Sequence, residues 1–382
     1  MNEYAPLLEA VRAIHRIPEG PVPLHAPIFK GREREYVLDT IDSTFVSSVG
    51  EYVNRFEGML REITSAKHAV ACVNGTAALQ VALVLAGVKP GDLVITQAVS
   101  FVATANAISH AGGEPVFLDI SPVTLGLSPE ALKLFLEQEC RMQGKKCVHK
   151  ATGQHVAACV PMHTFGLPCD IDSIAALCTE HGIPVVEDAA EALGSTYKGQ
   201  HCGTFGLLGT LSFNGNKIVT TGGGGAIITD DSELGRLAKH ITTTAKIPHR
   251  WEFRHDLCAW NFRLPNLNAA LGCAQLEQLG GFIEHKRNIA KAYGELLAGL
   301  PWEFVPEPAH SRSNYWLCAV RFSNKKERDA FLTVSNDAGI MTRPCWEPLQ
   351  TLPMYAERIK GPLQHAEQAT ATIVNLPSGV SY

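Results

Sequence analysis

Short apolar runs rich in β-branched residues alternate along the chain with longer stretches of helical periodicity. The apolar runs are 69–73, 93–96, 115–118, 156–160, 184–187 and 226–229, and helical spacing covers 76–86, 129–139 and 171–181 among others. Strands that alternate with helices predict an α/β fold with a mostly parallel sheet covered on both faces. Ligands of such sheets bind at the loops after the carboxyl ends of the strands. We therefore expect the chemistry in the segments that follow these runs.

The pattern changes after about residue 240. An aromatic, basic, turn-rich stretch at 249–262 is followed by the elements of a second, smaller α+β domain. These are one long helix over 267–297, a strand-like run at 315–322, a helix over 326–339 and a proline-rich tail. The 382 residues exceed the size at which a single core usually stops growing. We predict an N-terminal arm (1–30), a large domain (31–245) and a small domain (246–382). Residues 140–155 are polar and basic and predict a surface loop.

The composition narrows the classes of function. The net charge is −5 and no dense Lys/Arg stripe is present, so nucleic acid is not an expected partner. The N-terminus lacks the apolar core of a signal peptide, and the longest apolar stretch is too short to span a bilayer. We expect a cytoplasmic protein with no membrane partner. The eleven cysteines include no CxxC pair, which predicts reduced, buried thiols and no metal site.

One lysine precedes four consecutive glycines in "SFNGNKIVTTGGGGAIITDD". A phosphate-binding P-loop has its glycines before the lysine and Ser or Thr directly after it. A dinucleotide fingerprint opens a helix, whereas a strand-like run follows here. The glycines at 222–225 therefore indicate a tight turn and a close backbone approach beside a ligand. Lys217 becomes the candidate reactive group.

Three other strand ends carry groups that complement such a lysine. Asp188 ends an apolar run, where a carboxylate is costly to bury unless it meets a cation. Gly75 and Thr76, in "VNGTAAL", would present helix N-terminal amides and a hydroxyl to a phosphate. Phe101, in "SFVATANAIS", could stack on a planar ring. A phosphate cradle, a carboxylate, an aromatic ring and a lysine are the parts that hold pyridoxal 5'-phosphate.

These motifs, in this order, resemble the DegT/DnrJ/EryC1/StrS family of sugar aminotransferases. The resemblance runs from "PLHAPIFKGREREYV" to "TRPCWEPLQTLPMY". It implies a fold-type I pyridoxal phosphate transferase, with a mostly parallel seven-stranded sheet and a smaller α+β C-terminal domain. Within the family, "SSVGEYVNRFE", "VPMHTFGLPCDID" and "RLPNLNAALGCAQLEQL" most resemble the LegC-like branch.

The resemblance assigns cofactor roles residue by residue. Lys217 matches the Schiff-base lysine and Asp188 the partner of the pyridine nitrogen. Glu191 stands where the family usually has Gln or His near the ring hydroxyl, so its role is left open. The remaining positions match phosphate-binding, stacking and cross-subunit residues, namely Gly75, Thr76, Ser212, Phe101 and Asn261.

The resemblance also implies substrate contacts from His163, Arg263 and Trp346, and a homodimer with active sites shared between subunits. From the residues alone, His163 and Trp346 are explained as well by packing as by ligand contact. Trp260 and Phe262 replace the Gly and Tyr types that usually flank Asn261 in the family.

The implied reaction is a transamination. The amino group of L-glutamate would pass, through a pyridoxamine 5'-phosphate form and with release of 2-oxoglutarate, to a nucleotide sugar. For the LegC-like branch the acceptor is the 4-keto carbon of a UDP-linked 4-keto-6-deoxy-N-acetylhexosamine, for surface glycan or legionaminic-type nonulosonic acid synthesis. Alternatives are a dTDP-linked 4-keto-6-deoxyhexose, a 3-keto sugar, or a non-catalytic cofactor-binding regulator. A dehydratase of the same family is disfavoured, because those members typically carry His at the position of Lys217.

Overall fold

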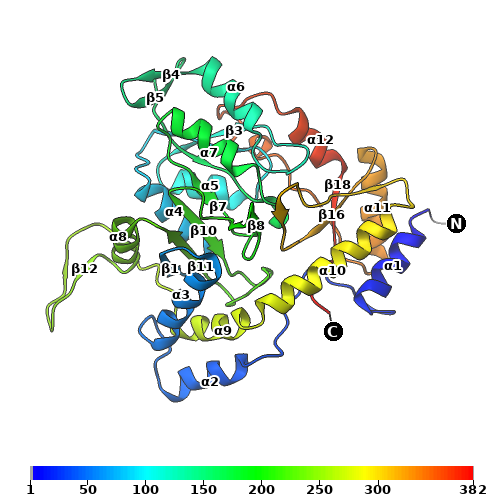
Figure 1. The fold of residues 1–382 in the computed structure, drawn as a ribbon, viewed down its shortest axis with the longest axis horizontal. Coiled ribbons are helices and arrows are strands. Elements are labelled where there is room, and N and C mark those ends of the chain that lie inside the picture. Colours follow the sequence, from blue (N-terminus) through cyan, green and yellow to red (C-terminus); the bar gives the residue numbers. More distant parts are fainter. Residues whose placement is uncertain (1–2, 382) are drawn as a thin grey trace.

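The computed structural model describes residues 3–381. Its larger lobe is built on a sheet with the strand order β3-β2-β6-β7-β10-β11-β1 (Figure 1). The seven strands are β1 (His68–Cys72), β2 (Leu93–Gln97), β3 (Glu114–Leu118), β6 (Val156–Val160), β7 (Val186–Asp188), β10 (Leu208–Ser212) and β11 (Gly225–Thr229).

Parallel pairing dominates this sheet. β2 pairs in parallel with β3 and β6, and β7 pairs in parallel with β10. Parallel bridges from Cys159 to Val185 and from Met162 to Asp188 join the two sets. β11 runs antiparallel to both β10 and β1. The predicted α/β fold with a mostly parallel seven-stranded sheet is confirmed.

Helices surround the sheet in the larger lobe (Figure 1). They are α2 (Glu33–Asp42), α3 (Glu51–Thr64), α4 (Gly75–Leu85), α5 (Val102–His110), α6 (Pro129–Glu139), α7 (Ile171–Glu180), α8 (Ser232–Thr242) and α9 (Asn266–Leu276). The prediction of a single helix over 267–297 is wrong. The chain breaks at Glu277 and Gln278, and α10 (Leu279–Leu297) follows. α9 packs into the core of the larger lobe with α2 and α3. The first turns of α10 pack into the same core, and the end of α10 packs into the smaller lobe.

The smaller lobe is an antiparallel sheet with helices. Its strands, in spatial order, are β14 (Glu303–Phe304), β16 (Cys318–Arg321), β18 (Ile373–Leu376) and β17 (Arg343–Pro344). Its helices include α10, α11 (Lys325–Asp337) and α12 (Gln364–Thr372). Helix α1 (Ala5–His15) joins the same core through Leu7 and Val11. The first 30 residues are thus partly a helix of this lobe, and not only an arm.

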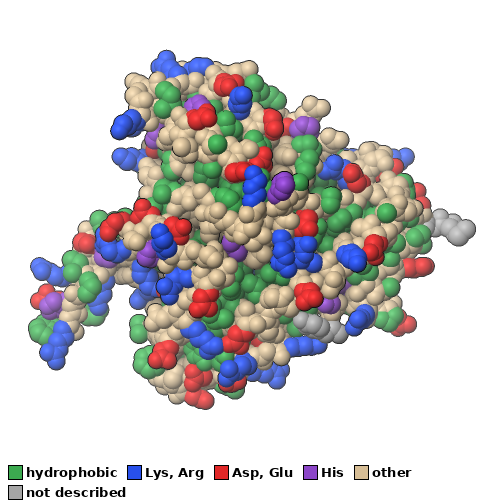
Figure 2. Space-filling model, in the orientation of Figure 1, with side chains coloured by type: hydrophobic (Ala, Val, Ile, Leu, Met, Phe, Trp, Pro, Cys, Tyr) green, Lys and Arg blue, Asp and Glu red, His purple; other side chains and the backbone are tan. Residues whose placement is uncertain are grey.

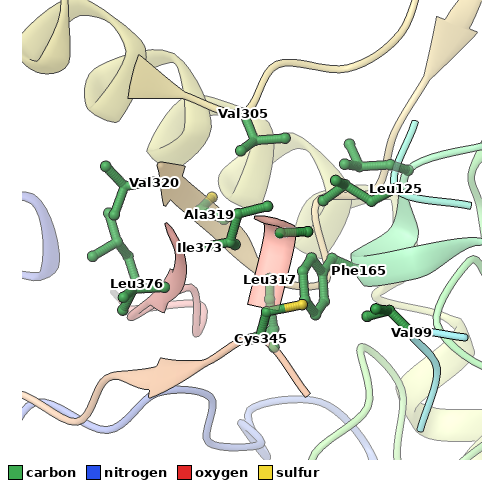
Figure 3. Close-up of a cluster of buried hydrophobic side chains, with 14 of the residues drawn as sticks. Val99, Leu125, Phe165, Val305, Leu317, Ala319, Val320, Cys345, Ile373 and Leu376 are labelled. Carbon is green, nitrogen blue, oxygen red and sulfur yellow. The ribbon is translucent and has the colours of Figure 1, made fainter. Parts of the chain in front are cut away.

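One hydrophobic cluster connects the two lobes (Figure 3). Val99 and Phe165 follow strands of the large sheet, and they lie beside Leu317, Cys345 and Ile373 of the smaller lobe. All five side chains are buried. Because close-packed interiors resist deformation, this cluster holds the smaller lobe in place over the carboxyl ends of the strands.

Two hairpins stand outside this core. β12 (Lys246–Ile247) and β13 (Arg254–His255) form an arm that projects from the larger lobe (Figures 1 and 2). Its tip carries Trp251 and Phe253, which are 69% and 78% exposed. The predicted surface loop at 140–155 contains a second hairpin, β4 (Cys140–Gln143) with β5 (Lys146–His149), whose inner residues Cys147 and Val148 are buried. A small sheet of β15 (Ser311–Arg312), β8 (Thr196–Tyr197) and β9 (Gln200–His201) completes the strands.

The expectations about the cysteines, membrane spans and metal ligands can be compared with the structure. All eleven cysteines are free and all except Cys258 are buried. No helix within residues 3–381 combines the length and apolarity needed to cross a membrane. The same residues contain no group of three or more His, Cys, Asp or Glu side chains placed to hold a metal ion.

Candidate active site

A cavity of about 810 Å³ lies between the carboxyl ends of the parallel strands and the smaller lobe. Most of the predicted site residues line it. They are Gly75, Thr76, Phe101, Asp188, Glu191, Ser212, Lys217 and Trp346. The smaller lobe contributes the opposite wall, which includes Trp316, Leu317 and Cys345.

Lys217 is held between a carboxylate and an aromatic ring. Its Nζ lies 3.1 Å from Glu191 Oε1 and 4.1 Å from the centroid of the Trp316 ring. Trp316 Nε1–H donates to the backbone carbonyl of Asn216 at 2.7 Å, which fixes the ring beneath the lysine. A cation over an aromatic face is attracted by the ring quadrupole. The lysine side chain is only 11% exposed, so its amine is confined to the cavity.

Glu191 is the buried partner of this lysine. Its second carboxylate oxygen, Oε2, accepts a hydrogen bond from the Phe165 backbone N–H at 2.9 Å. Burial raises the pKa of Glu191 to about 7, although Lys217 and the Phe165 amide oppose the rise. The carboxyl therefore changes its proton near neutral pH, beside the lysine amine. The resemblance placed this residue near the cofactor's ring hydroxyl; the structure places it in contact with Lys217.

Asp188 is a buried carboxylate at the end of β7. Its Oδ2 accepts from Thr104 Oγ1–H at 2.7 Å and its Oδ1 from the Ala190 backbone N–H at 3.1 Å. It is 5% exposed, and none of the ion pairs within residues 3–381 includes it. A buried carboxylate without a counter-charge is costly. The site therefore suits a ligand that brings a cationic group to Asp188.

The predicted phosphate cradle is the start of α4. Asn74 caps the helix by accepting from the Ala77 backbone N–H at 2.8 Å. A Cβ placed on Gly75 would lie 3.0 Å from Ser212 Cβ, so glycine is what lets the end of β10 approach the helix N-terminus. The free amides and positive dipole end of such a helix bind phosphate. Ser212 and Thr76 add hydroxyls to the same corner of the cavity.

Three of the four glycines after Lys217 are constrained by geometry. A Cβ on Gly224 would lie 2.2 Å from Thr221 Oγ1. Gly222 has a φ of +81°, which favours glycine. A Cβ on Gly225 would lie 2.4 Å from the Asn74 carbonyl and 2.6 Å from the Gly75 nitrogen. A Cβ on Gly223 would meet only the Val73 carbonyl oxygen within 4 Å, at 3.9 Å. The close approach predicted beside a ligand is thus an approach to the backbone of the phosphate cradle.

Phe101 and Trp346 form an aromatic wall. Their ring centroids are 6.2 Å apart, and Trp346 also lies 5.0 Å from the Phe165 ring. Phe101 is 49% exposed although it lines the cavity. An open aromatic face at the edge of the cradle can stack on a planar ring.

Three predicted site residues lie outside the cavity. His163 is fully buried, with Nε2 2.9 Å from Glu187 Oε2 and Nδ1 accepting from the Cys169 backbone N–H at 3.2 Å. Both ring nitrogens are occupied inside the protein, so the prediction of a substrate contact from His163 is corrected to a structural role. Asn261 and Arg263 lie at the base of the projecting arm, where Arg263 Nε–H donates to Asn261 Oδ1 at 3.2 Å. Their predicted roles toward a neighbouring subunit stay predictions.

Sequence reasoning missed Thr104 and Trp316, the residues that contact Asp188 and Lys217. Thr104 comes three residues after Phe101 in "SFVATANAIS", so its place in that motif could have indicated that it belongs to the site. Trp316 had no such signal, because nothing near it in the sequence indicates that its ring lies under Lys217.

These groups together fit pyridoxal phosphate. The cavity holds an amine on Lys217, a carboxylate without an ion-pair partner on Asp188, a helix N-terminus beside Ser212 that Gly75 opens, and the exposed ring of Phe101. Each matches one part of the cofactor, namely its aldehyde, its ring nitrogen, its phosphate and its ring face.

Comparison with known proteins agrees with this chemistry. The profile of the DegT/DnrJ/EryC1/StrS aminotransferase family matches residues 27–382. The chain is 36% identical over 362 residues to a GDP-perosamine synthase of Vibrio cholerae, covering 94% of both chains. It is 33% identical to a pleiotropic regulatory protein of Geobacillus stearothermophilus, covering 89% of this chain and 88% of the relative. The crystal structure of the aminotransferase TlmJ from Streptoalloteichus hindustanus superposes with a TM-score of 0.85 at 30% identity, over 94% of each chain. The chain therefore belongs to the DegT/DnrJ/EryC1/StrS family and is a pyridoxal phosphate-dependent aminotransferase.

Proposed function

We propose that this protein transfers the amino group of L-glutamate to the 4-keto carbon of a nucleotide-linked sugar, a UDP-linked 4-keto-6-deoxy-N-acetylhexosamine. The observation that carries the proposal is the pairing of Lys217 Nζ with Glu191 in the cavity that also holds the unpaired Asp188. The motifs "SSVGEYVNRFE" and "VPMHTFGLPCDID", similar to the LegC-like branch, support this acceptor.

The residues of the larger lobe would hold the cofactor. When bound, pyridoxal phosphate supplies an aldehyde that links to amino groups and a protonated ring that accepts the electron pair released at the substrate carbon. Gly75, Thr76 and Ser212 would bind its phosphate, and Phe101 would cover its ring. Asp188 would keep the ring nitrogen protonated, and each pKa unit of that effect corresponds to about 1.4 kcal/mol.

Lys217 and Glu191 would move the protons. The Lys217 amine, once free, takes a proton from the donor's α-carbon, and it returns a proton to the sugar carbon in the second half of the reaction. Glu191 lies 3.1 Å from that amine and changes its proton near pH 7. It can therefore receive the lysine's proton or return it as the direction of transfer changes.

A GDP-linked keto sugar is the second candidate acceptor. The similarity to a GDP-perosamine synthase over 94% of both chains favours it. The dTDP-linked alternative has weaker support, from 27% identity to DesI, whose crystal structure was determined in the presence of its TDP-sugar product. A regulator without catalysis would need neither the Lys217–Glu191 pair nor the uncompensated charge of Asp188.

We further propose a homodimer with shared active sites. Trp251 and Phe253, at the tip of the projecting arm, expose large apolar surfaces, which is typical of protein contact sites. Asn261 and Arg263 at the base of the arm would then reach the cofactor phosphate and the substrate of the neighbouring subunit.

The test begins with the purified protein, which should be yellow. Borohydride should fix the cofactor to Lys217, as located by mass spectrometry of peptides. Lys217→Ala should lose both the visible absorption band and amino transfer. UDP-, GDP- and dTDP-linked 4-keto sugars, assayed side by side with L-glutamate, should show which nucleotide is accepted. Amino transfer by Lys217→Ala would refute the assigned role, and preference for the GDP sugar would replace the UDP proposal.

A further inference from the structure

Two polar side chains that line the cavity have buried atoms without hydrogen-bond partners. They are His25, on the segment between α1 and α2, and Asn375, on β18. Both ring nitrogens of His25 and Nδ2 of Asn375 are buried and unpaired. Asn375 is only 3% exposed. Within residues 3–381, the other side chains with such atoms do not line this cavity; they are Ser311, Gln350, His365 and Ser381.

Unpaired buried polar atoms are uncommon because they lose their hydrogen bonds to water and gain nothing in return. Three such atoms in one cavity indicate that a bound ligand supplies their hydrogen-bond partners. Neither side chain is among the groups assigned to the cofactor. Asn375 is aligned in its sheet with Ala319 and Arg343 of the smaller lobe, whereas the phosphate cradle and Asp188 belong to the larger lobe. The pair is thus left for a substrate.

The chemistry of the two side chains narrows the substrate group. Burial, with the nearby cations Lys286 and Lys217, lowers the pKa of His25 well below its ordinary value. A neutral imidazole has one N–H donor and one acceptor nitrogen, and the Asn375 Nδ2 adds a donor. Hydroxyl and acetamido groups both donate and accept, so they can satisfy all of these atoms. A carboxylate only accepts and would leave one His25 nitrogen unpaired.

We propose that His25 and Asn375 recognise a hydroxyl or acetamido substituent of the acceptor sugar and so determine which sugars the enzyme accepts. This inference rests on the proposed nucleotide-sugar transamination. It assigns the pair to the half of the reaction that uses the sugar, and not to the half that uses glutamate.

The test uses apolar isosteres, His25→Phe and Asn375→Leu. Each removes the unpaired atoms and keeps the shape, so the stability in urea should be unchanged or higher. His365→Phe is the matched control, because His365 also has a buried unpaired ring nitrogen but lies outside the cavity. Should an isostere fail to fold, His25→Gln and Asn375→Asp take its place. Gln at position 25 keeps a hydrogen-bond donor and an acceptor, whereas Asp at position 375 replaces the amide donor with an acceptor.

Binding is measured without turnover, by calorimetry on borohydride-treated holoenzyme. The probes are UDP-N-acetylglucosamine, UDP-glucose and GDP-mannose. We expect His25→Phe and Asn375→Leu to weaken binding of the preferred probe by about 10- to 100-fold. His25→Gln should recover part of that loss, and His365→Phe should change nothing. A larger loss for UDP-N-acetylglucosamine than for UDP-glucose would identify the acetamido group as the contact, and the reverse would identify a hydroxyl.

The glutamate half-reaction is followed separately, by the loss of the visible absorption band on adding L-glutamate. Its apparent Kd should be the same in wild type and in both variants. An equal loss for glutamate would assign the pair to the donor and overturn the inference, as would unchanged sugar binding in the variants. If the wild type itself binds none of the three probes and accepts no 4-keto sugar, the proposed function fails and the inference fails with it.

Discussion

Replacement of Glu191 by glutamine should make the stability of the protein less sensitive to pH. Glu191 is 2% exposed, and its pKa is raised from the ordinary value of 4.5 to about 7, chiefly by burial. Between these two pH values the folded state keeps a proton that the unfolded state has released. The folded state therefore loses stability as the pH rises through this window. At about 1.4 kcal/mol per pKa unit, the loss is about 3 kcal/mol in total, complete above pH 7.

Glutamine has nearly the same shape and no charge to bury, so Glu191→Gln escapes this loss. We expect its free energy of unfolding, relative to wild type, to increase by about 3 kcal/mol between pH 4.5 and pH 7.5. The assay is urea unfolding of the cofactor-free protein across that range, at one protein concentration because any assembly changes apparent stability. Glu303→Gln is the control, since the Glu303 side chain is 74% exposed. A constant difference between Glu191→Gln and wild type at every pH would refute the reasoning.

Three other substitutions test separate parts of the site. Asp188→Asn keeps a hydrogen-bond acceptor for Thr104 but removes the negative charge. We expect the pKa of the cofactor's ring nitrogen to fall by about two units and kcat to fall about 100-fold. Steady-state kinetics measure this, and an unchanged kcat would contradict the assigned role. Thr104→Val removes the 2.7 Å hydrogen bond to Asp188 and should lower kcat about tenfold, with the KM for glutamate little changed. A change in KM with kcat unaltered would contradict a role of Thr104 through Asp188. Gly225→Ala places a Cβ 2.4 Å from the Asn74 carbonyl and should destabilise the protein by about 1–3 kcal/mol in urea. Gly223→Ala, its matched control, should stay within about 0.5 kcal/mol, and equal effects of the two would count against the close approach.

The sequence alone predicted the elements whose signals are local. Apolar runs and helical spacing placed most strands and helices of the larger lobe, because a half-buried strand or helix repeats its buried face at a fixed interval. The order of Lys217 and the glycines excluded a P-loop, because that motif is also defined by the local order of its residues. Asp188 and Gly75 were found because the carboxyl ends of parallel strands meet at one edge of the sheet.

Contacts between distant segments were not predictable in this way. The helical periodicity of 267–297 continues through residues 277–278, yet the helix breaks there, and only the end of its second part packs into the core of the smaller lobe. His163 follows a strand as the other site residues do, but Glu187 binds it inside the protein. No local pattern distinguishes these outcomes.

The sequence by itself determined the class of fold and the family, and it predicted Lys217 and Asp188 as the candidate lysine and carboxylate of the site. The tertiary structure alone decided what surrounds them. Trp316 lies beneath Lys217, Glu191 pairs with its amine, and His25 and Asn375 line the same cavity. The physical reason is that the cavity gathers residues up to 350 positions apart in the sequence. The packing of the smaller lobe over the strand ends brings Trp316 and Asn375 to the cavity, and burial in the folded protein raises the pKa of Glu191.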